Sequence, residues 1–442
     1  MFEVIFEMFS YTFLVRAFIV GALVSICAAL LGVSLVLKRY SMIGSGLSNV
    51  GFGSLALATA LNMAPLSVAI PVVIAAAFLL LRLSENSKIK GDAAIALVST
   101  GSLAVGVIII SQSTGMNTDV CNYLFGSILA MAKTDVILSI SLSVIVLVLF
   151  ILFYNKLFII TFDETFAKAS GIKTGLYNML IAFLTALTIV LGMRIMGAML
   201  ISSLIIFPAL SSMRIFKKFK SVTVCSAVIS ILCFFIGVVI SYLYAAPTGA
   251  SVVLVNLIVF VVFWLIETFR TNRFINLAVL KKFTTIFLIA VSVSLFTVNC
   301  SREKGNHDDN AGKSNQSKNS IFEIREKMFI AQVNDVYLNP DDYFGRSIKL
   351  EGIFMKEKVY EGEEDIYYVI RYAPGGCCGM DGMAGFEVKL TADEKQHIPA
   401  EESWVEAIGR LNELKSGFES YLYLELSSLT VLDKKGMEFV SQ

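Results

Sequence analysis

The chain carries little charge for its length. Charged residues make up 16% of its 442 residues, hydrophobic residues make up 56%, and the mean hydropathy is +0.75. A soluble domain of this size needs a more polar surface, so most of the chain must lie in a lipid bilayer. The net charge of +1 excludes a global electrostatic attraction to nucleic acid.

Histidine and intramembrane carboxylates are scarce as well. The two histidines, His307 and His397, lie outside the apolar runs, and no Asp or Glu occupies the middle of a run. Proton-coupled carriers use buried carboxylates or histidines as relays. Their scarcity argues against self-energised transport. The chain also lacks a Walker A pattern, so we do not expect an enzyme, and any ATP hydrolysis must come from another chain.

The apolar runs are confined to residues 1–300. We predict an all-α polytopic membrane bundle of about nine transmembrane helices, followed by a tenth signal-like or anchor helix. The runs lie near 12–37, 43–62, 64–83, 92–112, 135–155, 175–193, 198–213, 222–244, 248–267 and 283–299. A shorter stretch, 121–132, fits a half-buried or re-entrant segment.

Basic residues follow every odd-numbered run. These basic loops begin at Lys38, Arg82, Lys156, Arg214 and Arg270. The alternate loops are nearly free of Lys and Arg, with Lys133 and Arg194 as single exceptions. The positive-inside rule then places the N-terminus outside and the basic loops in the cytoplasm of a bacterium, with the chain multi-pass in the plasma membrane. The tenth run exports everything after it, so the C-terminal domain is expected to be extracytoplasmic.

The segment Lys38–Leu57, KRYSMIGSGLSNVGFGSLAL, combines a basic pair with glycines and the polar residues Ser45, Ser48 and Asn49. A span of this composition suits the lining of a path. The alternative is a Gly/Ser packing face between helices, which is common in membrane bundles.

Two further stretches stand out. In MRIMGAMLISSLIIFPAL, the polar pair Ser202 and Ser203 and the helix-breaking Pro208 lie inside an apolar run, where a freed carbonyl must be satisfied by protein or a cavity. The cytoplasmic loop TFDETFAKASGIKT predicts a short helix, because acidic residues come first, a basic residue follows and a glycine ends it. It is either a plain connection or a docking helix for a cytoplasmic partner. Its candidate docking residues are Asp163, Glu164, Phe166, Lys168 and Gly171.

Four segments together resemble the permease subunit of ABC-type zinc/manganese importers. KRYSMIGSGLSNVGFGSLAL resembles the family segment with a basic pair before IGDALSHA; CNYLFGSILAMAKTD resembles YLFGDILAV; FDETFAKASGI resembles FDPEFARASG; and MRIMGAMLISSLIIFPAL resembles VVGVLLVSALLVIPAA. Their order and spacing agree over roughly residues 10–268. The resemblance implies a homodimeric permease, a separate cytoplasmic ATPase that docks on the FDETFAKASG helix, and an extracytoplasmic metal-binding protein.

One departure from the family concerns the metal path. The aspartate and histidine of GDALSH, which the resemblance implies as metal contacts, are replaced here by Ser45 and Asn49. Mn²⁺ and Zn²⁺ prefer carboxylate or imidazole ligands, whereas Ser and Asn offer weak neutral oxygens. Either the permease passes a metal without binding it tightly, since conduction needs weak sites, or the substrate has changed.

Residues 271–300 contain a basic stretch and an apolar core that ends at Cys300, which resembles a lipoprotein signal. The alternatives are lipidation of Cys300 or a plain tenth helix with a chance cysteine. Residues 301–320 have the composition of a disordered linker. The predicted domains are therefore 1–270 (permease), 271–300 (exit segment), 301–320 (linker) and 321–442 (exported accessory domain).

The accessory domain is predicted to be β-rich. After a helix at Ile321–Val336, strands are expected at Ser347–Phe354, Ile366–Tyr372, Phe386–Thr391, Ser403–Leu411 and Tyr421–Leu432. Short strands separated by turns predict a small OB-like barrel. The pieces YFGRSIKLEGIF, RYAPGGCCGMDG and WVEAIGRL resemble the C-terminal domain of YcgQ-type permease partner proteins.

Cys377 and Cys378 are the sharpest chemical feature of this domain. Adjacent thiols outside the cell form a strained disulfide or bind a soft metal, and two thiolates with Asp381 suit Zn²⁺. A structural turn with a disulfide is the alternative.

Three hypotheses follow from these observations. The leading one is an ABC permease for divalent metal ions fused to an exported domain. The second is a degenerate permease that anchors an exported metal- or redox-binding domain. The third, a thiol–disulfide exchange enzyme, ranks last because adjacent cysteines suit that chemistry less well than a CxxC pair.

Overall fold

A computed structural model describes residues 11–61, 63, 65–86, 91–112, 133–244, 246–271, 321–326, 328–357, 365–373, 382–390, 398–416, 419–432 and 434–440. The predicted segments 121–132, 283–299 and 301–320 lie outside these residues, as do Cys300, Cys377, Cys378 and Asp381.

Each predicted apolar run in the described part of the chain falls on one helix. These helices are α2 (Thr12–Leu37), α3 (Ile43–Ala60), α4 (Pro65–Asn86), α5 (Gly91–Gln112), α7 (Lys133–Phe162), α9 (Thr174–Met196), α10 (Ala198–Ile215), α11 (Phe219–Tyr244) and α12 (Thr248–Thr271). Helix formation is expected because a helix satisfies its own backbone polar groups where water is absent.

Six of the described helices are long and apolar enough to cross a membrane, namely α2, α7, α9, α10, α11 and α12. The chain is therefore a multi-pass membrane protein. The apolar parts of α4 and α5 are shorter, at Ser67–Arg82 and Ala93–Ile109. Helix α3 is less hydrophobic, because it contains several Gly, Ser and Asn residues. The helical bundle is confirmed, while the span count of about nine stays a prediction.

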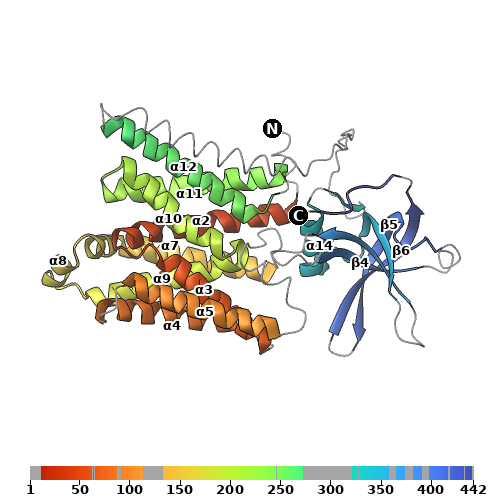
Figure 1. Ribbon diagram of the computed structural model, residues 1–442, viewed down its shortest axis with the longest axis horizontal. Coiled ribbons are helices and arrows are strands. Elements are labelled where there is room, and N and C mark those ends of the chain that lie inside the picture. Colours follow the sequence, from red (N-terminus) through yellow and green to blue (C-terminus); the bar gives the residue numbers. More distant parts are fainter. Residues whose placement is uncertain are drawn as a thin grey trace.

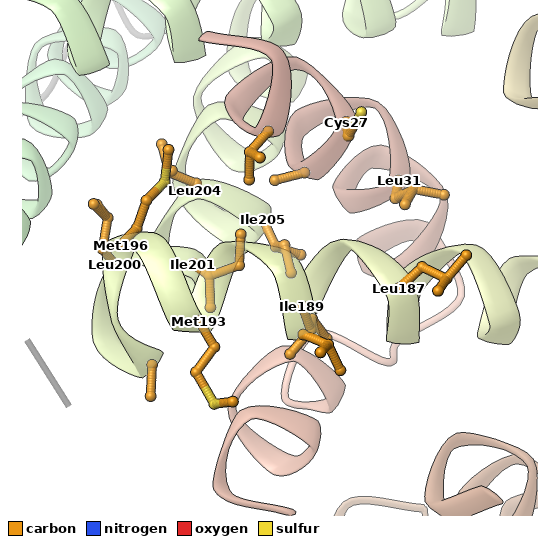
Figure 2. Packing of buried hydrophobic residues seen from close by; sticks show 14 of the residues in the cluster. Cys27, Leu31, Leu187, Ile189, Met193, Met196, Leu200, Ile201, Leu204 and Ile205 are labelled. Atoms are coloured by element: carbon orange, nitrogen blue, oxygen red, sulfur yellow. The ribbon is translucent and has the colours of Figure 1, made fainter. Parts of the chain in front are cut away.

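Helix α2 occupies the centre of the bundle. It packs against α9 and α10, where Leu31, Leu187, Met193 and Leu204 belong to one buried apolar cluster (Figure 2). In contrast, α7 and α12 lie at the edge of the bundle. Only 22% and 28% of the residues in their most apolar 18-residue segments are buried. The central helix is thus shielded by protein, and the edge helices present apolar side chains outward.

A glycine sets the closest approach in this core. A Cβ on Gly32 of α2 would lie 2.0 Å from the backbone oxygen of Ile205 in α10. Backbone atoms cannot yield as a flexible side chain can, so only glycine allows these two helices to touch here.

We therefore expect Gly32→Ala to destabilise the bundle by about 1–3 kcal/mol, as overpacking does in other cores. Gly101→Ala in α5 is the matched control, because an added Cβ there meets nothing within 4 Å. Thermal unfolding of the purified protein in detergent measures both. Equal unfolding temperatures for the two variants would contradict the assigned contact.

The C-terminal part is a β-sheet domain, as predicted. Its elements are β1 (Phe322–Ile324), α14 (Phe329–Leu338), the 3₁₀ turn η1 (Pro340–Asp342), β2 (Ser347–Glu357), β3 (Ile366–Ala373), β4 (Gly382–Lys389), β5 (Trp404–Ser416) and β6 (Glu419–Val431). The sheet order is β1-β2-β3-β4-β6-β5, and β2 also pairs with β5. Strands β2 to β6 therefore close into a small barrel around apolar residues such as Phe354 and Phe386.

The predicted helix at Ile321–Val336 is wrong in its first half. Phe322–Ile324 form β1, which pairs in parallel with Ile348–Leu350 of β2. The helix α14 starts only at Phe329, after Met328 with a left-handed φ of 62°. The partner strand lies more than twenty residues further along the chain, so the local pattern could not reveal this pairing.

A buried arginine fixes α14 on the barrel. The guanidinium of Arg371 in β3 lies 4.8 Å from the ring of Phe329 and 4.9 Å from that of Trp404. Its Nε donates to the backbone oxygen of Glu351 at 2.7 Å, and Nη1 pairs with Glu326 at 3.1 Å. These contacts compensate the burial of the charge and orient α14 toward the helical bundle (Figure 1).

Candidate functional site

The predicted path residues of α3 and α10 meet in the structure. The Ser48 hydroxyl, 1% exposed, lies 3.2 Å from the Ser202 hydroxyl. Each hydroxyl also bonds to the carbonyl four residues earlier in its own helix, Ser48 to Gly44 at 2.8 Å and Ser202 to Ala198 at 2.9 Å. The two serines thus form a neutral polar contact between two apolar helices.

Asn49 connects the same helix to α5. Its Nδ2 donates to the hydroxyl of Ser99 at 2.7 Å. Ser45 is partly buried one turn earlier, and its backbone oxygen accepts from Ser48 at 3.1 Å. The three polar residues of α3 therefore supply hydroxyl and amide groups, without a carboxylate or an imidazole.

The glycines of α3 make close helix contacts, as the packing alternative expects. An added Cβ would lie 2.6 Å from the Ser102 backbone oxygen at Gly53, and 3.3 Å from Ile205 Cδ1 at Gly44. The helix thus packs against α5 and α10 within the chain, and its polar residues lie along these same contacts.

Ser203 and Pro208 are both buried in α10. The hydroxyl of Ser203 bonds to the Leu200 carbonyl at 2.8 Å within the helix. Pro208 does not end the helix, which continues to Ile215. The helix tolerates this proline because protein surrounds it on all sides.

The short helix predicted in this loop is confirmed as α8 (Glu164–Ala169), while its docking role stays a prediction. Asp163 is its N-cap and accepts from the Phe166 backbone N–H at 3.0 Å, and Glu164 pairs with Lys168 at 2.9 Å. The hydrogen bond from Thr165 and then that from the Phe166 N–H lower the pKa of Asp163. Gly171 follows the helix with a φ of +76°, which glycine adopts without strain.

The exposed face of α8 presents Phe166, whose exposed fraction is 61%. The helix lies at one end of the bundle, and the C-terminal domain lies at the other (Figure 1). An exposed aromatic residue on a capped, charged helix combines an apolar group with polar groups, as the anchors of protein interfaces do.

A polar network joins α8 to the turn that precedes the N-terminus of α3. Lys38, in the turn between α2 and α3, donates to the side chain of Asn178 in α9, which is 3% exposed. Asn178 also hydrogen bonds to Glu164 of α8. Burial opposes ionisation of Glu164, but the hydrogen bond from Lys168 and the charge of Lys38 outweigh it, so its pKa is lowered.

This network places one buried amide between α8 and the turn that precedes α3. Lys38 and Glu164 stand out in the sequence, whereas Asn178 was not predicted to take part. A single Asn near the start of a long apolar run was the available signal.

The predicted metal site of the C-terminal domain lies outside the described residues, and so does the predicted lipidation site. Among the residues that the structure describes, there is no group of three or more His, Cys, Asp or Glu side chains that could hold a metal ion.

The fold and the site together define a polytopic membrane protein with a short, exposed, capped helix at one end of its bundle and a neutral polar contact among its central helices. The chain belongs to the ABC 3 transport family, whose model matches residues 10–267. Residues 300–440 match a second model, the DUF1980 C-terminal domain.

Several characterised proteins are similar to the helical part. The chain is 34% identical to a probable metal transport system membrane protein of Thermotoga maritima over 58% of this chain and 90% of the relative. It is 29% identical to the manganese import system permease protein ScaB of Streptococcus gordonii, over 59% and 93% of the two chains. It is also 29% identical to the high-affinity zinc uptake system membrane protein ZnuB of Haemophilus influenzae, over 59% and 97%.

A solved structure shares the fold of the bundle. The structure of PsaBC from Streptococcus pneumoniae in complex with Fab matches with a TM-score of 0.54 and 30% identity, covering 59% of this chain and 94% of that chain.

The Lys38–Asn178 pair is open to a double-mutant cycle. We expect Asn178→Leu and Lys38→Met each to destabilise the protein by about 1–3 kcal/mol, because each removes a hydrogen bond between a charged group and a buried amide. The double variant should lose less than the sum, by a coupling of about 0.5–3 kcal/mol. Unfolding in detergent gives all four values, and strictly additive losses would show that the two groups do not interact.

Proposed function

We propose that the chain is the permease subunit of an ABC importer for divalent metal ions of the zinc or manganese class. The single observation that supports this most is membership of the ABC 3 transport family across the whole helical bundle. Relatives of similar length in that region carry manganese and zinc transport names. The exposed, capped helix α8 fits the same role, since an inactive permease has no need of a coupling element.

In this proposal a separate ATPase binds α8 on the cytoplasmic side, and an extracytoplasmic metal-binding protein delivers the ion. The permease works as a homodimer. Edge helix α7 supports a second copy or lipid as neighbour, since Ile137 and Ile151 are each 69% exposed. Within the chain, Lys38, Asn178 and Glu164 link the ATPase side to α3.

The proposed path follows α3 and α10, with Ser45, Ser48, Asn49, Ser202 and Ser203 as its polar residues and Pro208 beside them. Neutral hydroxyl and amide oxygens hold a divalent ion weakly, and weak sites favour passage over retention. Selectivity in this design comes from the delivering protein and not from a tight site within the membrane.

The tail is proposed to lie outside the cell. Helix α2 runs from the tail end, where Arg16 meets Asp342, to the α8 end, where Lys38 meets Asn178. Helix α9 starts at the end of the bundle where α8 lies, and α10 ends there. Glu267, near the C-terminal end of α12, pairs with Arg214 of α10 at 2.9 Å, so α12 ends on the same side. The chain between Thr271 and Phe322 must therefore connect the two ends, and the apolar run 283–299 supplies a tenth crossing.

The closed strand order, with β4 and β6 parallel, supports an OB-like barrel that serves as an accessory module, as in YcgQ-type partner proteins. Its Cys377, Cys378 and Asp381 are the proposed zinc or soft-metal ligands, and Cys300 is the proposed lipidation point. The second candidate function is a degenerate permease that anchors this metal- or redox-binding domain. Ser45 and Asn49 favour it, because they offer neither the carboxylate nor the imidazole that Mn²⁺ and Zn²⁺ prefer.

Metal uptake tests the leading proposal. Cells that express the chain with its ATPase should accumulate Zn²⁺ or Mn²⁺, and Asp163→Ala with Glu164→Ala should lower the initial rate by about tenfold or more, as loss of interface anchors does. Glu413→Gln in the tail is the control for an exposed acidic residue elsewhere. The importer proposal is rejected if cells with the intact chain take up no metal, or if the substitutions at Asp163 and Glu164 leave the uptake rate unchanged.

The cysteine pair is tested on the full chain. Peptide mass spectrometry without reductant, combined with elemental analysis after Zn²⁺ loading, should find either a Cys377–Cys378 disulfide or bound zinc that Cys377→Ser with Cys378→Ser abolishes. Finding neither would leave an ordinary turn and remove the support for a metal or redox domain.

A further inference from the structure

Two cations at one end of the bundle, Arg16 and Lys133, have no acidic partner among the bundle helices that the structure describes. Arg16 is the only charged side chain in the 26 residues of α2. Lys133, the first residue of α7, is one of the two basic residues that break the positive-inside pattern. Charges in such positions are costly in or near a bilayer unless they are compensated.

Both cations meet acidic groups of the C-terminal domain. Arg16 Nη2 lies 3.0 Å from Asp342 Oδ2, and Arg16 Nη1 lies 3.5 Å from Asp335 Oδ1. The Lys133 ammonium pairs with the other oxygen of Asp342. Asp342 therefore bridges α2 and α7 from a position more than 200 residues away in sequence.

A backbone contact joins the same two parts. The Lys133 N–H, at the start of α7, donates to Asn339 Oδ1 at 3.0 Å. The first N–H groups of a helix have no partner within the helix, so Asn339 of the tail satisfies a group that α7 cannot satisfy itself. Here the N-terminus of a membrane helix is capped by a different domain.

The acidic side of the contact is held in place within the tail. Asp335 is 1% exposed, and it accepts from the Tyr343 hydroxyl and from Asn339 Nδ2 at 2.8 Å. Burial raises the pKa of Asp335, and the hydrogen bonds of these two residues and the charge of Arg16 partly offset it. Burial also opposes ionisation of Asp342, but hydrogen bonds from Lys133 and Arg16 outweigh it and lower its pKa.

Apolar groups complete the interface. Met328 and Ala331, at the start of α14, are 5% exposed and belong to the same buried cluster as Leu14 of α2. The contact thus combines a small apolar core with ion pairs at its rim, which is the composition of an interface. Helix α14 is the element of the tail that faces the bundle (Figure 1).

The depth of Arg16 agrees with a contact at the membrane surface. Helix α2 is about 39 Å long at 1.5 Å per residue. It therefore exceeds the hydrocarbon core of about 30 Å, and Arg16 in its second turn reaches the interface region. The tail acids meet the guanidinium there, and not within the lipid.

We propose that the ends of α2 and α7 form a docking site for the chain's own C-terminal domain, recognised through Asp335, Asn339 and Asp342. The domain is a fixed part of the permease's outer end and not a module that moves freely on its linker. The placement of this end outside the cell rests on the proposed function, but the docking itself does not.

Hydrogen–deuterium exchange of the full chain in lipid nanodiscs tests this proposal. Arg16→Gln with Lys133→Gln should accelerate exchange in the segment 329–343 by about tenfold, because undocking exposes it. Exchange in β5 and β6 should not change, since both substitutions lie outside the barrel. Arg214→Gln, which removes the ion pair with Glu267 at the opposite end, is the matched control and should leave 329–343 unchanged.

Salt provides a second measurement on the unmodified chain. Raising the salt concentration from 0.05 to 0.5 M shortens the screening length, so it should accelerate exchange in 329–343 more than in the barrel. Wild-type exchange in 329–343 for the double variant would overturn the proposal. This result is distinct from a failure of metal uptake, because docking is measured without any transport.

Discussion

The structure depends on one constraint, which is that polar groups brought into an apolar bundle must find partners inside the protein. The serines of α3 and α10 meet it by bonding to carbonyls of their own helices and to each other. Asn178 meets it by bridging Lys38 and Glu164. The hydrogen bonds that cross from one helix to another therefore also fix the positions of the two elements that they join.

The same constraint explains how two ends of the bundle acquire different roles. At one end the polar network includes α8, which is capped by Asp163 and exposes Phe166. At the other end the partner is already part of the chain, since Asp342 of the tail compensates Arg16 and Lys133. Between them, the contact of α3 with α10 is made by the neutral hydroxyls of Ser48 and Ser202.

The sequence predicts the elements well because their signals are local. The apolar runs marked the helices, the charge order of 163–168 marked α8, and the alternation of 347–432 marked the strands of the barrel. Contacts between distant segments carried no such signal. The pairing of Phe322 with Ile348 turned an expected helix into a strand, and the pairing of Arg16 with Asp342 was not foreseen.

Some of the contacts between distant segments do have a signal in the sequence. Lys133 appeared as an exception to the charge rule, and an exception of this kind indicates a cation with a protein partner. Asn178 was a lone amide in an apolar run. The glycines of α3 were assigned to a path or to packing, and the structure shows close packing at Gly53 and Gly44.

The contact between Arg16 and Asp342 also has a consequence for biosynthesis. The two residues are 326 positions apart, so the first helix to be made carries its charge before the partner exists. At about 5–20 residues per second the ribosome needs roughly tens of seconds to reach the tail. During that interval the charge of Arg16 must be compensated by the insertion machinery, by lipid headgroups or by water, and its partner within the protein forms only when the C-terminal domain has been made and folded.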